Sequence, residues 1–333
     1  MNVNKRLLMT LLAGVIVAST STPVRGEPCC IIVVPPQPPP SEKKEPAPAS
    51  SYGPIYAQLP LLAAIERKLF GDLKVSIQTR EVRNATKEVG QTLGTLGIGP
   101  ISEVAAWNMQ GGAKVQVIGV VVNRADYGLV SGLTGPTSII GLKGQRIVVP
   151  ASDELGRVYV AQVLRAAGLR EGDVKVEVQD RSAFQPAVLV KAFDRADSGA
   201  TLTFDGFKWE TWGKVKRLTG PAAVTIPLWV LYSGSDTLLK EPKQVTQFLK
   251  GIDAGLKAVK GEPQLARSLL DRLEVGAGTA QAIAQLVPLV LPDTVRPNVA
   301  QIEQTVTVLK DIGYTKDIPW VTDEASLKKI YGP

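Results

Sequence analysis

The 333-residue sequence contains no histidine, only two cysteines, and aromatic residues amount to just 5%. The missing histidine removes the commonest general base and the commonest metal ligand of proteins. Ser-His-Asp and Cys-His nucleophiles, imidazole zinc sites and the two-histidine iron site are therefore excluded. The low aromatic content argues against a sugar site, which stacks sugar rings on several aromatic side chains. These absences favour a binding protein over an enzyme, and we expect neither a metal nor a cofactor.

The N-terminus has the pattern of a secretory signal peptide over residues 1–26. Lys5 and Arg6 precede an apolar run, Leu7 to Ala18, which is shorter than the about 20 residues that a membrane-spanning helix needs. An uncleaved anchor is the alternative. Cleavage after Gly26 would leave 35 basic against 31 acidic residues, so the formal net charge falls from +7 to +4. We therefore expect a periplasmic protein that does not bind nucleic acid.

Cys29 and Cys30 are adjacent, and adjacent cysteines rarely bridge each other. An exposed thiol, an intermolecular bridge and, less favoured, a lipid anchor are the alternatives. The prolines that follow forbid a helix and favour an extended polyproline conformation. We therefore expect residues 27–50 to be a disordered Pro-rich linker and the folded body to begin near Ser51.

From residue 51 onward, strand-like and helix-like segments alternate, which predicts an α/β fold. Residues 114–122 form a nearly continuous apolar run rich in β-branched residues, which predicts a buried central strand. Residues 146–149 predict another strand, followed by a helix that Gly168 ends. Residues 245–259 follow the i, i+3, i+4, i+7 rule of an amphipathic helix, and the chain beyond them is helical in character.

Three stretches together resemble the type II periplasmic solute-binding proteins of ABC importers, in the nitrate/sulfonate/taurine branch that also includes binders of pyrimidine precursors. Ser138–Val178 matches a short lead, a strand ending in Val-Pro, a helix ending in Ala-Gly-Leu and a further strand. Gly97–Ser102 is similar to the family's Asp-Ile-Gly loop, and Asn123–Gly128 follows it. Val308–Tyr314 looks like the terminal helix of the family.

The resemblance implies a two-lobed type II periplasmic-binding-protein clamshell with two crossover segments. Lobe 1 would comprise residues 51–125 plus 226–333, and lobe 2 residues 130–222. The solute would lie at the carboxyl ends of the strands, where open α/β sheets bind ligands. A monomer would capture a small organic solute between its lobes and deliver it to an ABC permease in the inner membrane.

The resemblance also suggests which residues bind the solute. Tyrosine offers a flat apolar face with a polar tip, glycine lets the backbone approach a ligand, and hydroxyl or amide groups offer hydrogen bonds. The candidates are Tyr52, Tyr56, Gly99, Pro100, Ser102, Asn123, Arg124, Ser152, Asp153, Asp197 and Phe204. Several have a structural alternative: packing for the tyrosines, a helix cap for Ser102, a hinge contact for Asn123 and plain exposure for Arg124.

The start of the helix after Pro150 departs from the sulfonate-binding pattern, because Asp153 and Glu154 follow Ser152. These carboxylates either cap their own helix or face a cationic or hydrogen-bond-donating solute group. Both alternatives weaken the case for nitrate or a plain sulfonate as the solute.

Two other functions are compatible with such a clamshell in related proteins. A tethered sensor or partner-binding module would use the same clamshell without transport. Eukaryotic relatives of the pyrimidine-precursor branch are enzymes that consume their own histidine, which this chain lacks. We therefore expect no enzymatic activity.

Overall fold

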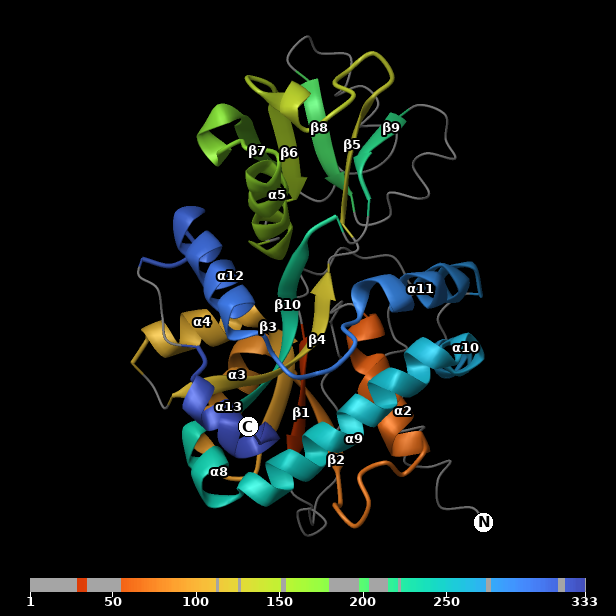
Figure 1. Ribbon diagram of the computed structural model, residues 1–333, viewed down its shortest axis with the longest axis vertical. Helices are drawn as coiled ribbons and strands as arrows, with labels where there is room; N and C mark the ends of the chain where they lie inside the picture. The colour runs from red at the N-terminus through yellow and green to blue at the C-terminus, as the bar shows by residue number, and fades with distance from the viewer. Residues whose placement is uncertain are drawn as a thin grey trace. The chain divides into compact units, whose positions relative to one another are not determined.

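The computed structural model describes residues 29–34, 55–111, 114–124, 127–150, 154–179, 198–203, 215–220, 223–273, 277–316 and 321–332. The predicted signal peptide lies outside these residues. The chain divides into two compact units, and each contains one five-stranded sheet with helices packed on it (Figure 1). Unit 1 comprises residues 1–122, 229–302 and 319–333, and unit 2 comprises residues 123–228 and 303–318. The α/β prediction is confirmed.

Sheet 1, in unit 1, has the strand order β2-β1-β3-β10-β4. Its strands are β1 (Cys29–Val34), β2 (Ser76–Glu81), β3 (Leu96–Pro100), β4 (Val115–Arg124) and β10 (Thr225–Gly234). Strand β1 pairs antiparallel with both β2 and β3, so β2 and β3 run in the same direction. Strand β10 is antiparallel to β3. We call the edge at which β2 and β3 end the carboxyl edge of sheet 1.

The prediction of a disordered linker over residues 27–50 is wrong for the six residues of β1. The sequence Cys-Cys-Ile-Ile-Val-Val is rich in β-branched residues, which favour a strand, and it contains no proline, whereas Pro28 precedes it and the proline-rich run begins at Pro35. Strand β1 lies between β2 and β3 and is thus part of sheet 1. The folded part of the chain therefore includes a strand that precedes the Pro-rich segment. Residues 35–50 lie outside the described residues.

Strand β4 is buried along most of its length, as predicted, but it is an edge strand and not a central one. Segments from the C-terminal part of the chain cover its open side. The backbone N–H groups of Val117 and Val120 donate to the carbonyls of Val321 (2.7 Å) and Val295 (2.9 Å). The Tyr331 phenol donates to the Ile118 carbonyl at 2.7 Å. A covered edge cannot pair with another chain, which explains why so apolar a strand is tolerated there.

Helices cover both faces of sheet 1. Figure 1 shows α3 (Val82–Gln91) and α4 (Ile101–Met109) on one side and α2 (Leu59–Glu66) with α9 (Pro242–Gly261) on the other. The remaining helical segments of unit 1 are the 3-10 helix η1 (Ile55–Gln58) and the helices α8 (Ser235–Lys240), α10 (Pro263–Arg272), α11 (Ala277–Val290) and α13 (Glu324–Tyr331). No helix in the described part of the chain is both long and apolar enough to cross a membrane.

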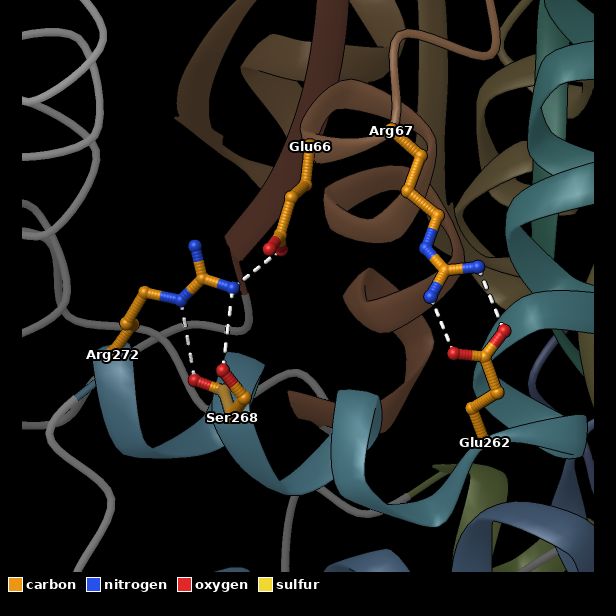
Figure 2. Close-up of polar contacts among 5 residues, drawn as sticks. All are labelled: Glu66, Arg67, Glu262, Ser268 and Arg272. Carbon is orange, nitrogen blue, oxygen red and sulfur yellow. Dashed lines mark hydrogen bonds and ion pairs between the residues drawn. The ribbon is translucent and has the colours of Figure 1, made fainter.

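Ion pairs join the end of α2 to α10 on the surface of unit 1 (Figure 2). Arg67 donates from both terminal nitrogens to the two carboxylate oxygens of Glu262. Its neighbour Glu66 accepts a hydrogen bond from Arg272 at 2.5 Å, and Arg272 also donates to the Ser268 carbonyl at 3.3 Å. The two pairs therefore fix both ends of α10 against α2.

Sheet 2, in unit 2, has the order β7-β6-β8-β5-β9. Its strands are β5 (Gly128–Gly132), β6 (Arg146–Pro150), β7 (Lys175–Gln179), β8 (Ser198–Thr203) and β9 (Val215–Thr219). Strand β6 is parallel to β7 and β8, whereas β5 is antiparallel to β8 and β9. Short 3-10 helices, η2 (Ile140–Leu142) and η3 (Glu171–Asp173), flank β6 and β7. The edge at which β6 and β8 end is the carboxyl edge of sheet 2.

The helix α5 (Glu154–Ala166) follows β6, and Gly168 has a φ of 76° just after it, as expected of a residue that ends a helix. The second half of α12 (Val299–Asp311) belongs to the same unit. Gln304 donates to Gln162 at 3.3 Å, and Arg165 of α5 forms an ion pair with Asp311. This explains why residues 303–318 group with unit 2, whereas the expected lobe 2 ended at residue 222.

The two crossover segments expected from the resemblance correspond to β4 and β10. The boundary between the units falls after Val122 in β4 and after Leu228 in β10. The chain also passes between the units within α12 and again after Ile318.

Candidate functional site

The carboxyl edge of sheet 1 contains three of the predicted site residues. Gly99 and Pro100 end β3, and Ser102 lies in the first turn of α4 with only 3% of its surface exposed. Pro100 occupies the N-cap position of α4, and no side chain caps that helix. The alternative of Ser102 as a helix cap is therefore not realised. Because α4 starts with uncapped N–H groups, this edge can offer backbone donors to a solute.

Two further features of this edge were not predicted. Trp229 of β10 pairs in register with Pro100 and is 6% exposed. The backbones of Cys29 and Cys30 pair with Glu81 and Arg80 at the end of β2. The sequence could not indicate this position for the cysteines, because the segment was assigned to the linker.

Gly97, which precedes Gly99 by two residues, has a packing role. It pairs in register with Tyr232 of β10, and a side chain at this position would collide with the ring of Tyr232. The pattern Gly97-x-Gly99 therefore reflects the fit between two strands and gives no evidence for a phosphate loop.

The carboxyl edge of sheet 2 is formed by the end of β9, the start of β5 and the helix α5. Gly128 pairs with Thr203, the last residue of β8, and Leu129 pairs with Thr219, the last residue of β9. The Tyr159 phenol of α5 lies 2.7 Å from the Thr219 hydroxyl. None of these residues was among the predicted site residues.

Tyr127 immediately precedes β5 and belongs to the motif Asn123–Gly128 noted in the sequence. Its ring lies 5.5 Å from that of Tyr159 at an interplanar angle of 43°, and the two residues are 6% and 0% exposed. The aromatic pair thus packs α5 against the segment that links β4 and β5. The motif contained the signal for this contact, but nothing in the sequence pointed to its partner on α5.

Asn123 and Arg124 end β4, immediately after the unit boundary. The Oδ1 atom of Asn123 is buried and has no hydrogen-bond partner among the described residues. A buried amide oxygen without a donor is costly, so this atom offers an acceptor for a solute N–H or O–H group. Arg124 is exposed, which fits the alternative that it is an ordinary surface side chain.

The other predicted residues are not brought into a common site. Tyr56 lies in η1, 4% exposed, which fits the packing alternative for this tyrosine. Tyr52, Ser152, Asp153, Asp197 and Phe204 lie outside the described residues. Helix α5 starts at Glu154, so the segment before it does open a helix as expected. In the described part of the chain, no three acidic, histidine or cysteine side chains are grouped to hold a metal.

A family model described as NMT1/THI5 like matches residues 58–266, more than half of the chain. Among solved structures, the periplasmic aliphatic sulphonate binding protein SsuA from Escherichia coli is similar at a TM-score of 0.59 with 15% identity, over 84% of this chain and 97% of that one. The alkanesulfonate-binding protein SsuA from Xanthomonas axonopodis pv. citri, bound to MOPS, gives 0.52 with 15% identity, over 81% and 94%.

A Candida albicans protein described as exhibiting the generic periplasmic binding protein structural fold gives a TM-score of 0.51 with 15% identity, over 84% of this chain and 92% of that one. No curated protein sequence matches the chain. At these identities the likeness shows the fold, which is the predicted periplasmic-binding-protein fold.

Proposed function

The chain belongs to the NMT1/THI5-like family, and on this premise we propose that it is an exported solute-binding protein that captures a small organic solute between its two units and delivers it to an ABC importer. The proposal goes beyond the fold, because one fold can serve many functions. Its support comes from the described carboxyl edges and from the strands that join the units.

One observation carries the proposal: β4 runs from unit 1 into unit 2, and β10 runs from unit 2 back into unit 1. Each of these strands has ten residues and reaches a carboxyl edge near the point where it changes unit. Asn123 follows the boundary in β4, and Trp229 follows the boundary in β10. Segments in which the chain passes from one unit to the other are the positions at which a hinge motion of two units about a ligand can occur.

The chemistry of the described residues favours an organic solute with hydrogen-bond donors. Asn123 offers a buried acceptor oxygen, and the uncapped start of α4 offers N–H donors. The similar proteins from Escherichia coli and Xanthomonas bind sulfonates according to their descriptions. Organic sulfonates, carboxylates, amides and aminopyrimidines are therefore the solute classes to test.

Two measurements on the purified mature protein test the proposal. Native mass spectrometry detects a solute that the protein carries from its host cell. A thermal-shift panel of MOPS, ethanesulfonate, taurine, succinate, acetamide and 4-aminopyrimidine then screens the solute classes. We expect a 1:1 complex and at least one compound that raises the melting temperature, because a ligand that binds only the folded state stabilises it. A protein that carries no solute and that no compound stabilises would contradict the proposal.

A further inference from the structure

The phenol of Tyr159 joins three segments at the carboxyl edge of sheet 2. Its oxygen lies 2.7 Å from the Thr219 hydroxyl oxygen at the end of β9 and 3.2 Å from the carbonyl oxygen of Gly220. The Thr219 hydroxyl also accepts a hydrogen bond from the backbone N–H of Leu129 in β5, at 3.1 Å. Tyr159 itself has no exposed surface. One buried side chain of α5 therefore holds the ends of two strands.

The positions of the hydrogens follow from the chemistry of the partners. A carbonyl can only accept, so the phenolic hydrogen of Tyr159 points to Gly220. Either hydroxyl could donate at the 2.7 Å contact, and with the phenolic hydrogen pointing to Gly220 we assign the donor role to Thr219. The N–H of Leu129 donates to the remaining acceptor position on Thr219. The hydrogen bonds thus run in one direction from Leu129 to Gly220, and such chains strengthen each other.

The network joins the middle of α5 to the end of β9, next to the end of β8. Leu129 pairs with Thr219, and its neighbour Gly128 pairs with Thr203, the last residue of β8. Tyr159 lies five residues after Glu154, the first residue of α5, which corresponds to about 7.5 Å along a helix. The same side chain therefore fixes the N-terminal half of α5 relative to the end of β9.

We propose that Tyr159 is a positioning residue of the solute site, and that its phenolic hydroxyl contributes more to solute affinity than to folding. This inference rests on the proposed function. Tyr159 is fully buried and acts through Thr219, Gly220 and the N-terminal half of α5. Among the described residues, removal of the phenolic hydroxyl leaves the Gly220 carbonyl with only the Ala223 N–H as donor, at 3.3 Å, and the Thr219 hydroxyl with only the Leu129 N–H, at 3.1 Å. The link from α5 to the end of β9 is then lost, and we expect the strand end to shift. A displacement of about 1 Å is enough to reduce binding strongly.

The test compares four variants by calorimetric titration with MOPS, ethanesulfonate and the other compounds of the panel above. Tyr159→Phe and Thr219→Val each break the network, and Thr219→Ser restores the hydroxyl. Tyr331→Phe is the matched control, because that phenol also donates to a backbone carbonyl, Ile118, at 2.7 Å, but in unit 1. The melting temperature of each ligand-free variant reports stability separately from affinity.

We expect Tyr159→Phe and Thr219→Val to weaken binding by about tenfold or more, while Thr219→Ser recovers most of the loss. Tyr331→Phe should lower the melting temperature and leave affinity at the wild-type value. If the wild type binds a compound and Tyr159→Phe binds it with the same affinity, this inference is overturned but the proposed function is not. A wild-type protein that binds none of the compounds would overturn the proposed function and this inference with it.

Discussion

The carboxylate of Asp253 accepts a hydrogen bond from the backbone N–H of Val295 at 2.9 Å. This contact joins α9 to the segment that covers the open side of β4, because the Val295 carbonyl accepts from Val120. Burial alone would raise the pKa of Asp253, but hydrogen bonds from Lys257, Val295 and Thr294 outweigh it and leave the pKa below the ordinary 3.8.

Asp253→Asn should therefore lower the free energy of unfolding at neutral pH by about 1 kcal/mol, since a charge-assisted contact becomes a neutral one. The pKa of Asp253 is lower in the folded protein than in the unfolded chain, where it is near 3.8. The stability that the carboxylate contributes is therefore complete above pH 3.8 and is lost as the pH falls through the lower pKa of the folded protein. Urea unfolding at neutral pH and again near pH 2 measures the difference between variant and wild type. A difference of the same size at both pH values would show that the charge is not the cause.

Removal of strand β1 should destabilise unit 1. A shortened protein beginning at Ser51 lacks the strand that pairs with both β2 and β3, whereas one beginning at Glu27 retains it. We expect the shorter protein to be insoluble, or to melt at least about 10 °C lower, since each lost kcal/mol corresponds to ~2–4 °C in a protein of this size. Circular dichroism melts of both proteins make the comparison. Equal melting temperatures would mean that β1 adds nothing to the fold.

The ion pair between Arg67 and Glu262 should stabilise the protein only at low salt. Its hydrogen bonds raise the pKa of Arg67 and lower that of Glu262, but both side chains are exposed and salt screens such pairs. Glu262→Gln should lower the melting temperature in dilute buffer and have no effect at about 1 M salt, where the Debye length is ~3 Å. Arg267→Ala is the control. Arg267 also lies in α10, but it forms no ion pair with any of the described residues. A salt-independent effect of Glu262→Gln would point to packing instead.

Inorganic sulfate and nitrate should bind weakly or not at all, because the sequence has two acidic residues, Asp153 and Glu154, where α5 begins. The double variant Asp153→Asn and Glu154→Gln should bind sulfate more tightly than the wild type. Calorimetric titration of both proteins with sodium sulfate tests this. Micromolar affinity in the wild type would refute the charge argument.

The strongest sequence patterns predicted the fold well. Strands over residues 114–122 and 146–149 and the helix over 245–259 all agree with β4, β6 and α9 to within a few residues. Continuous apolar runs and helical periodicity identify such elements because burial of one face dictates them. The same runs could not distinguish an edge from a centre: β4 is apolar because C-terminal segments cover it, and those lie about 180 residues or more away in the chain.

The candidate site was harder to predict, because its described parts depend on contacts between distant residues. Gly99, Pro100 and Asn123 lie at strand ends as expected. Tyr159 and Thr219 are 60 residues apart, and neither belongs to a motif of its own. The packing of α5 against the end of β9 brings them together, and the local sequence around either residue carries no signal for that contact.

The last prediction concerns the close approach of α2 and α9, which depends on Gly255. A Cβ atom at this position would collide with the Pro60 carbonyl and lie 3.0 Å from the backbone nitrogen of Ala64. Gly255→Ala should therefore cost about 1–3 kcal/mol of unfolding free energy, more than the ~1 kcal/mol that alanine gains in a helix. Gly261, in the same helix, has open space around it, so Gly261→Ala should be neutral or slightly stabilising. Urea unfolding of both variants decides the matter, because helix propensity alone would stabilise both, whereas close packing of α2 penalises only Gly255→Ala.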